Sequence, residues 1–359
     1  MGAARRGPVG VVQRWFRRRR RRQALRVLAP KAKGRIVHEP NPTAAQPLDS
    51  FRFFAVLGTW MEEDVVEATV RNALAQGVEA VYMVDNASTD DTVPRAVAAG
   101  ATLVDTFATR HYEERIRILL MNAVVARQSL ASGSPHVWWL WLDADEFPEG
   151  PDGMTIVEYL RGLDRRFRVV GSTYYNHYPT DRPEYLPGFH PLDFQPLCER
   201  YTSKHVHHCR QPHWKHPLMR FDDTGPFILA GGGFHTGTLR TRQPLCEPTG
   251  GIVTHHVCYR DEEAARRRLE LLCGVSERNA SNDAIGNRTI QRRFDSLDAV
   301  YARDWSRVNN LRGDEPAYGV DPTPWSDTGS TRRWYGPADL AAARTAWLAE
   351  HDGSSLVAD

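Results

Sequence analysis

The 359-residue sequence lacks the long hydrophobic run that a membrane span needs, since the apolar stretch VWWLWL at residues 137–142 is far too short. Its N-terminal arm also lacks the apolar core of a secretory signal, because it never reaches seven consecutive apolar residues. Cysteine is scarce: five residues, an odd number, are scattered along the chain. We therefore expect a cytoplasmic protein with reduced thiols and no disulfide framework.

Acidic side chains are missing from the first 35 positions, which hold thirteen Lys or Arg. The remaining chain has 33 basic and 44 acidic residues, so a mildly acidic body carries a basic arm. An arginine run of this kind is typically disordered and attracts anionic lipid or nucleic acid. We weigh a peripheral contact with the inner face of the cell membrane against a solvated tail. No platform of aromatic and basic residues follows, so we expect no specific nucleic acid partner.

Four sections can be distinguished along the chain. Residues 1–50 form the basic arm and a proline-rich linker, and residues 301–359 a C-terminal wrap. Between them we expect one α/β domain with a first half at 51–150 and a second half at 151–300.

The first half alternates between strand and helix patterns. Hydrophobic periodicity predicts strands at 53–57, 79–85, 101–107 and 137–143, with helices at 62–76, 92–99 and 111–131 between them. This order predicts a central, mostly parallel sheet flanked by helices, a Rossmann-like architecture. Right-handed crossovers place the carboxyl ends of all its strands at one edge, where such folds bind ligands.

The second half is less regular. It contains one further strand pattern at 165–175, shorter ones at 217–222 and 227–235, and a helix pattern at 262–279. Asp261 is a reasonable N-cap for that helix.

Carboxylates stand where two of the predicted strands end. Asp85 closes the second strand, and Asp143, Asp145 and Glu146 close the fourth. In extended backbone, residues two apart point the same way, so Asp143 and Asp145 project together. Carboxylate oxygens suit Mg²⁺ or Mn²⁺, which also bind diphosphate oxygens and screen the charge on a departing nucleotide. We therefore expect a metal and diphosphate site at this edge.

Two stretches carry a family resemblance. VDNASTDDT at 84–92 and WLWLDADEF at 139–147 resemble the family 2 glycosyltransferases of the GT-A fold, in the branch whose second motif reads aspartate-x-aspartate-glutamate-phenylalanine. The resemblance covers roughly residues 51–273, and its first half is the more specific. It implies that residues 51–150 form a nucleotide-sugar-binding half and residues 151–300 an acceptor-binding, catalytic half. One departure is Met61, where that family often has asparagine. The resemblance implies transfer of a sugar, as in a hexosyltransferase, from a nucleotide-diphosphate donor, UDP-sugar favoured, to a saccharide or glycolipid of polysaccharide biosynthesis.

The resemblance also implies roles for matched residues. Asp85 would read the base, with Glu62 nearby, and Asp143 would face the ribose or a metal-bound water. Asp145 would bind Mn²⁺ or Mg²⁺, completed by a late histidine. The residues implied for nucleotide binding are Glu62, Asp85, Arg115, Asp143 and Lys215, and those for the metal are Asp143, Asp145, His256 as first choice and His235 as second.

Inverting transfer also needs a general base to deprotonate the acceptor hydroxyl. This residue is expected in the second half of the domain, where the sequence does not single out one carboxylate. The candidates are Asp181, Glu184, Asp193 and Glu199, with Glu146 as a further one that could instead support the metal.

Three alternatives use the same residue types. The segment 198–216 holds two cysteines and five histidines, but its spacing matches no compact zinc pattern. A phosphatase of the haloacid-dehalogenase type also uses aspartate-x-aspartate after a strand, with the first as nucleophile, although this motif comes late and Phe147 replaces the usual threonine or valine. A non-catalytic sugar-nucleotide-binding relative would keep the fold alone.

Overall fold

The structure is a computed structural model that describes most of the predicted domain. The described residues are 36–108, 114–178, 197–200, 215–222, 228–229, 239–240, 244–257, 259–260, 262–263, 265–267, 269–270, 294–295, 297–304, 307, 319–320 and 334–335.

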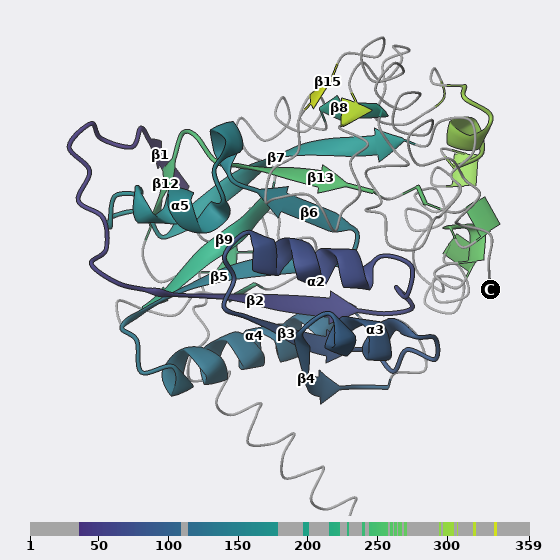
Figure 1. Cartoon of the computed structure of the whole chain (residues 1–359), viewed down its shortest axis with the longest axis horizontal. Coiled ribbons are helices and arrows are strands. Elements are labelled where there is room, and N and C mark those ends of the chain that lie inside the picture. The colour runs from purple at the N-terminus through teal and green to yellow at the C-terminus, as the bar shows by residue number, and fades with distance from the viewer. Residues whose placement is uncertain are drawn as a thin grey trace, which may run out of the picture.

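A nine-stranded, mostly parallel sheet forms the centre of the molecule (Figure 1). Four parallel strands begin it: β4 (Ala101–Thr106), β3 (Ala80–Asp85), β2 (Arg52–Thr59) and β5 (His136–Asp143). The sheet continues through antiparallel β9 (Lys215–Asp222) to β7 (Val169–Tyr178), β13 (Ile252–His256) and β6 (Glu146–Glu149), with β8 (Leu197–Arg200) beside β7. The sheet therefore has the predicted α/β architecture.

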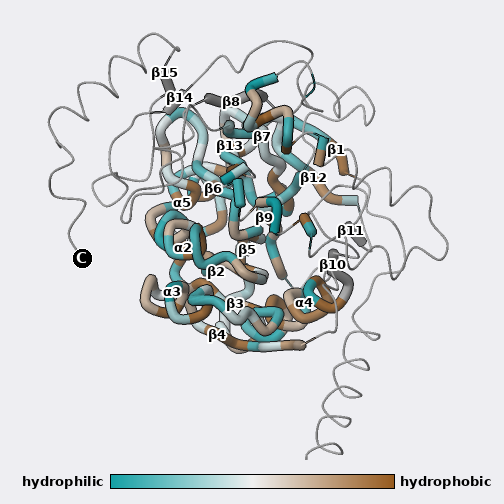
Figure 2. Tube along the Cα trace, turned by 90° about the vertical axis from the view of Figure 1, so that its right-hand side faces the viewer, coloured by the Kyte–Doolittle hydropathy of each residue, from teal (hydrophilic) through white to brown (hydrophobic). Residues whose placement is uncertain are grey.

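Helices cover both faces of the parallel half. Helices α2 (Val66–Ala75), α3 (Thr92–Ala98) and α5 (Ile156–Arg161) contribute to one hydrophobic core. Helix α4 (Glu114–Ala131) builds a second core on the opposite face. Figure 2 shows this layering, with β2, β3 and β5 between α2 and α3 on one side and α4 on the other.

Alternation along the central strands explains the two cores. Phe53, Ala55 and Leu57 of β2 face the α2 layer, whereas Phe54 and Val56 face α4. Because both faces are covered, β2 is buried at every position after Arg52, which is typical of a parallel sheet. The helix α2 ends ahead of Gly77, whose φ of 90° is the left-handed conformation that glycine adopts without strain.

The structure also contains strands that the sequence patterns did not indicate. Strands β6 and β13 pair antiparallel, and β1 (Ile36–Glu39) pairs in parallel with β12 (Leu245–Pro248). The shorter pairs are β10 (Ile228–Leu229) with β11 (Leu239–Arg240) and β14 (Gly319–Val320) with β15 (Trp334–Tyr335); a 3-10 turn lies at Pro151–Gly153. Only 228–229 of the predicted strand 227–235 is described, and Asp261 lies outside the described residues.

Within the part of the chain that the structure describes, no helix is long and apolar enough to cross a membrane.

Candidate functional site

The predicted carboxylates meet at one edge of the sheet. In the strand register, Asp85 of β3 is beside Thr59 of β2, and Asp143 of β5 is beside Gly58 of β2. Both aspartates therefore stand at the carboxyl ends of parallel strands, one on either side of β2. The expectation that they lie at the same edge of the sheet is confirmed.

Asp85 is held by three hydrogen bonds from its own neighbourhood. Its Oδ1 accepts from the hydroxyls of Thr59 at 2.8 Å and Ser88 at 2.7 Å, and its Oδ2 accepts from the Ser88 backbone N–H at 2.8 Å. A carboxylate has about four acceptor positions, so these bonds leave room for one more donor at Oδ2. The side chain is buried and fixed in direction, as a hydrogen-bond acceptor for a ligand would need to be.

Asp143 lies between two cations. Arg117 of α4 donates to its Oδ1 at 2.8 Å, and Lys215 Nζ lies 3.5 Å from its Oδ2. Burial raises the pKa of Asp143, but the charges of Arg117 and Lys215 outweigh burial and leave that pKa below its ordinary value. A Cβ at Gly58 would come within 2.8 Å of Arg117 Cδ, so glycine leaves the space that this arginine occupies.

Glu146 is more enclosed than its neighbours Asp143 and Asp145. Tyr174 of β7 donates to one of its oxygens at 2.8 Å, and Lys215 pairs with the other. Burial raises the pKa of Glu146, and the charge of Lys215 opposes that rise. Lys215 also lies 4.9 Å from the centre of the Tyr174 ring, so this cation is shared by two carboxylates and an aromatic face.

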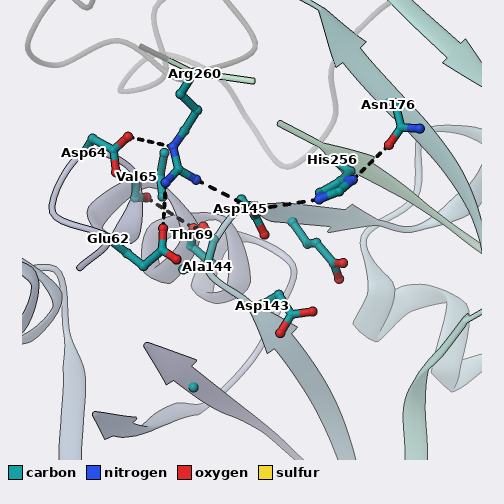
Figure 3. Close-up of polar contacts among 12 residues, drawn as sticks. Glu62, Asp64, Val65, Thr69, Asp143, Ala144, Asp145, Asn176, His256 and Arg260 are labelled. Carbon is teal, nitrogen blue, oxygen red and sulfur yellow. Dashed lines mark hydrogen bonds and ion pairs between the residues drawn. The ribbon is translucent and has the colours of Figure 1, made fainter. Parts of the chain in front are cut away.

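Asp145 lies in the turn between β5 and β6, so the extended backbone from which Asp143 and Asp145 were expected to project together ends at Asp143. Its side chain lies between Arg260 and His256 (Figure 3). Its Oδ2 lies 3.7 Å from His256 Nε2 and 3.8 Å from Arg260 Nη1. Both distances exceed a hydrogen bond, and both partners come from the chain at or after β13. The acid of the strand-end motif is thus brought beside a histidine 111 positions later in the chain.

Arg260 connects Asp145 with the loop after β2. It donates to Asp64 at 2.6 Å and to Glu62 at 2.7 Å while its third nitrogen faces Asp145. The arginine is only 3% exposed, so these ion pairs are shielded from water. Tyr301 donates to the Arg260 carbonyl at 2.7 Å and thereby also fixes the backbone here.

His256 belongs to a row that crosses three strands. In the register of the sheet, Asn176 of β7, His256 of β13 and Glu146 of β6 are direct neighbours. Asn176 Oδ1 lies 2.8 Å from His256 Nδ1, on the side of the ring away from Asp145 (Figure 3).

The charges and donor types fit a divalent cation beside Asp145. No group of three or more His, Cys, Asp or Glu among the described residues forms a complete metal cage. Mg²⁺, however, usually takes one or two protein ligands and draws the rest from phosphates and water. Asp145 Oδ2 and His256 Nε2 are 3.7 Å apart, less than twice the roughly 2.1 Å of one such bond, so both can reach one ion.

The ion pairs around the edge also leave an excess of negative charge. These ion pairs form two groups. In the first, the cations Arg117 and Lys215 balance the carboxylates Asp143 and Glu146. In the second, three carboxylates, Glu62, Asp64 and Asp145, lie around the single guanidinium of Arg260, so the excess of negative charge lies at the Asp145 side.

Several predicted site residues remain untested. Asp181, Asp193 and His235 lie outside the described residues, as do Glu184 and most of the segment 198–216. Arg115 and Glu199 are described in backbone only: Arg115 lies in α4, and Glu199 of β8 is the register partner of Asn176.

Other site residues were missed by the sequence reasoning. Arg117, two positions after the predicted Arg115, is the cation that donates a hydrogen bond to Asp143. Helical phase could have indicated it, because Arg117 precedes the buried Met121 by four positions and Val124 by seven. Asn176 and Tyr174 had no such signal, since their strand was recognised but its neighbours were not.

No protein-family model and no curated protein matches this sequence. A structure described as a mycobacterial protein matches at 24% identity over 35% of this chain and 41% of its own length, with a TM-score of 0.24. Glucosyl-3-phosphoglycerate synthase from Mycobacterium tuberculosis with Mg²⁺ and uridine diphosphate matches at 21% identity, over 39% and 51%, with a TM-score of 0.24.

The same synthase with Mn²⁺, uridine diphosphate and glucosyl-3-phosphoglycerate matches at 18% identity, over 65% of this chain and 81% of that one, with a TM-score of 0.31. In the first two matches, the chain spans only about half the length of the solved structure or less. With TM-scores this low, the function proposed below rests on the residues of this chain.

Proposed function

We propose that this protein is a metal-dependent glycosyltransferase that transfers a sugar, with inversion, from a UDP-sugar to a saccharide or glycolipid acceptor. The observation that carries the proposal is the approach of His256 Nε2 to Asp145 Oδ2 at the carboxyl edge of a parallel sheet. A hard carboxylate and an imidazole suit a cation that takes its remaining ligands from phosphate oxygens and water.

Each carboxylate then has a separate task. Asp85 accepts a hydrogen bond from the base, because its position is fixed and one acceptor position remains. Asp145 and His256 hold Mn²⁺ or Mg²⁺, which stabilises the charge that develops on the leaving diphosphate. Asp143 is neutralised by Arg117 and Lys215, so its role is to face the ribose or a metal-bound water rather than to bind the metal alone.

The general base is proposed to lie near the row that contains His256. Glu146 is enclosed by Lys215 and Tyr174, which favours a supporting role for it. Among the other candidates, Glu199 of β8 is the register partner of Asn176, which in turn is the register partner of His256, so Glu199 lies two strands from His256. We therefore favour Glu199 over Asp181 and Asp193. Replacing each by its amide and measuring the rate of transfer would rank them, with the true base costing about 10²–10⁴-fold.

The basic arm is proposed to bring the enzyme to anionic membranes, where such acceptors are assembled. Thirteen positive charges without an acid are enough for peripheral binding, at about 1 kcal/mol per charge near the surface. Co-sedimentation with phosphatidylserine vesicles, at low and high salt and with residues 1–35 deleted, tests this part separately. Binding that survives the deletion would contradict it.

Calorimetric titration tests the proposed function directly. UDP, GDP and ADP are titrated into the wild-type protein with Mn²⁺ and, separately, with EDTA. We expect one diphosphate, UDP, to bind only with Mn²⁺, and Asp145→Asn to weaken that binding by at least about 100-fold, as loss of a charged metal ligand should. Asp164→Asn is the matched control, because Asp164 caps a turn beside Gln46 and Arg166, away from the site.

Two results would contradict the proposal. One is the absence of binding by any of the three nucleotides, which would favour the phosphatase or the binding-module alternative. The other is UDP binding that EDTA and Asp145→Asn leave unchanged, which would retain a nucleotide site but remove the metal from it.

A further inference from the structure

We infer that Asn176 is a positioning residue that fixes the tautomer of His256 and so presents Nε2 of that ring to the metal. The inference rests on the proposed function, because it needs His256 as a metal ligand. It adds a residue to the site that neither the motifs nor the resemblance indicated.

Asn176 lies on the side of the His256 ring that is away from Asp145. Asn176 Oδ1 contacts Nδ1 at 2.8 Å, while Nε2, on the far side of the ring, faces Asp145 at 3.7 Å. The two residues are register neighbours on the parallel strands β7 and β13. Backbone hydrogen bonds of the sheet therefore hold the carboxamide and the ring side by side, independently of any ligand.

The chemistry of the contact determines where the imidazole proton resides. An amide oxygen only accepts hydrogen bonds, so Nδ1 must carry the proton in this pair. A neutral imidazole has one N–H, so Nε2 then keeps a lone pair. A metal-ligating histidine characteristically donates its other N–H to an acceptor of this kind, which fixes the ring and raises its basicity.

Burial distinguishes this arrangement from an incidental contact. Asn176 is only 1% exposed, and its Nδ2 has no hydrogen-bond partner among the described residues. A buried donor without a partner costs about 1–3 kcal/mol, which an apolar residue would avoid. The opposite orientation of the amide would bring Nδ2 to Nδ1 and place the proton on Nε2, where it would block metal binding. The tautomer therefore distinguishes the two orientations.

The neighbouring histidine provides a natural comparison. His255, one position earlier on β13, points to the opposite face and lies between His177 at 3.1 Å and Glu149 at 3.1 Å. Its side chain is 1% exposed, so it is enclosed on that face. His255 and His256 thus share a strand and a residue type but differ in the side chains that their ring nitrogens contact.

The first measurement is nitrogen NMR of the metal-free protein labelled at histidine. Long-range nitrogen–proton couplings identify the protonated nitrogen, and His256→Gln assigns the signal. We expect Nδ1–H at His256 in the wild type and loss of that preference in Asn176→Leu, which keeps the volume but removes the acceptor. Nε2–H in the wild type would overturn the inference, whatever the metal does.

The second measurement is the affinity for Mn²⁺ with UDP present, followed by electron paramagnetic resonance of the free ion. We expect Asn176→Leu to weaken binding by about 10–100-fold, and Asn176→Asp, which keeps an acceptor, to bind more tightly than the leucine variant by about tenfold. Asn122→Leu is the control, because Asn122 is also buried but bonds within α4 to the Ile118 carbonyl. Its Mn²⁺ affinity should equal that of the wild type.

The outcomes separate the two proposals. Wild-type protein that binds no Mn²⁺ with UDP would remove the proposed function. Binding that is lost in His256→Ala but unchanged in Asn176→Leu would keep the function and overturn the role of Asn176. Thermal unfolding of each variant shows which of them fold.

Discussion

Two aspartates at the carboxyl edge of the sheet have different surroundings. We call these the Asp85 corner, with Thr59 and Ser88, and the Asp145 corner, with His256 and Arg260. At the Asp85 corner, three hydrogen bonds of 2.7–2.8 Å come from Thr59 and Ser88. At the Asp145 corner, the distances from its Oδ2 to His256 Nε2 and Arg260 Nη1 are 3.7 and 3.8 Å. Asp85 is oriented by hydrogen bonds from its own half of the domain. Asp145 instead faces His256 and Arg260 from the second half, both beyond hydrogen-bond distance. This difference suits an acceptor for a base in one place and a ligand for a metal in the other.

Breaking the Asp145 corner should have the largest effect on stability. Arg260→Met leaves Glu62 and Asp64 without their shared cation, and removing one partner of a buried ion pair costs about 3–5 kcal/mol. Arg266→Met is the matched control, because Arg266 is 39% exposed and pairs with Glu262 and Asp298 at the surface. That change should cost under about 1 kcal/mol. Urea unfolding of both variants measures the difference, and equal losses would refute the buried network.

Breaking the Asp85 corner should cost less. In Asp85→Asn one oxygen becomes an NH₂ group, which faces the N–H of Ser88 or the two hydroxyls instead of accepting from them. Loss of such charge-assisted bonds costs about 2 kcal/mol. Thr59→Val removes only one donor and should cost about 1 kcal/mol. Chemical denaturation checks this order, and a variant Asp85→Asn as stable as the wild type would contradict it.

The loop beside the Asp85 corner offers a substitution that should raise stability. Met61 has a φ of 56°, a left-handed conformation that costs most residues about 1–2 kcal/mol and that asparagine adopts more readily. Met61→Asn, the residue that the resembling family often has here, should therefore stabilise the protein by about 1 kcal/mol. Thermal unfolding measures it, with Met154→Asn as the control, because Met154 has an extended backbone. A Met61→Asn variant less stable than the wild type would show that the Sδ contact with Thr89 outweighs the backbone preference.

A third cluster, remote from both corners, separates effects on the scaffold from effects on the site. Glu247 is fully buried and lies 3.0 Å from both His38 of β1 and His216 of β9. The contact with Glu247, partly offset by burial, raises the pKa of His38. Because the folded pKa is raised, the contact stabilises fully below the ordinary pKa of about 6.5, and its contribution disappears as the pH rises through the folded pKa.

The difference in unfolding free energy between wild type and His38→Gln should therefore be larger at pH 5.5 than at pH 9. The effect should stay under about 1 kcal/mol, since the side chain is partly exposed. Urea unfolding at both pH values measures it. A difference that grows with pH would reverse the sign and contradict the assignment.

The sequence predicted the first half of the domain well because its contacts follow local rules. Strand and helix periods identified β2, β3, β4 and β5, and the direction of parallel strands alone placed Asp85 and Asp143 at one edge. In the second half, β6 and β13 are short and pair antiparallel, and no period marked them. Their register nevertheless decides which side chains surround the proposed metal ligands Asp145 and His256.

The sequence by itself therefore determined the α/β architecture, the edge where the carboxylates gather and the two aspartates that end its strands. Only the tertiary structure decided which side chains meet. Arg117 pairs with Asp143, Arg260 lies between Glu62, Asp64 and Asp145, and Asn176 contacts His256. The physical reason is range. Backbone period and strand direction are set by neighbours in the chain. Ion pairs and hydrogen bonds between side chains depend on residues up to 198 positions apart, which meet only once the sheet has formed.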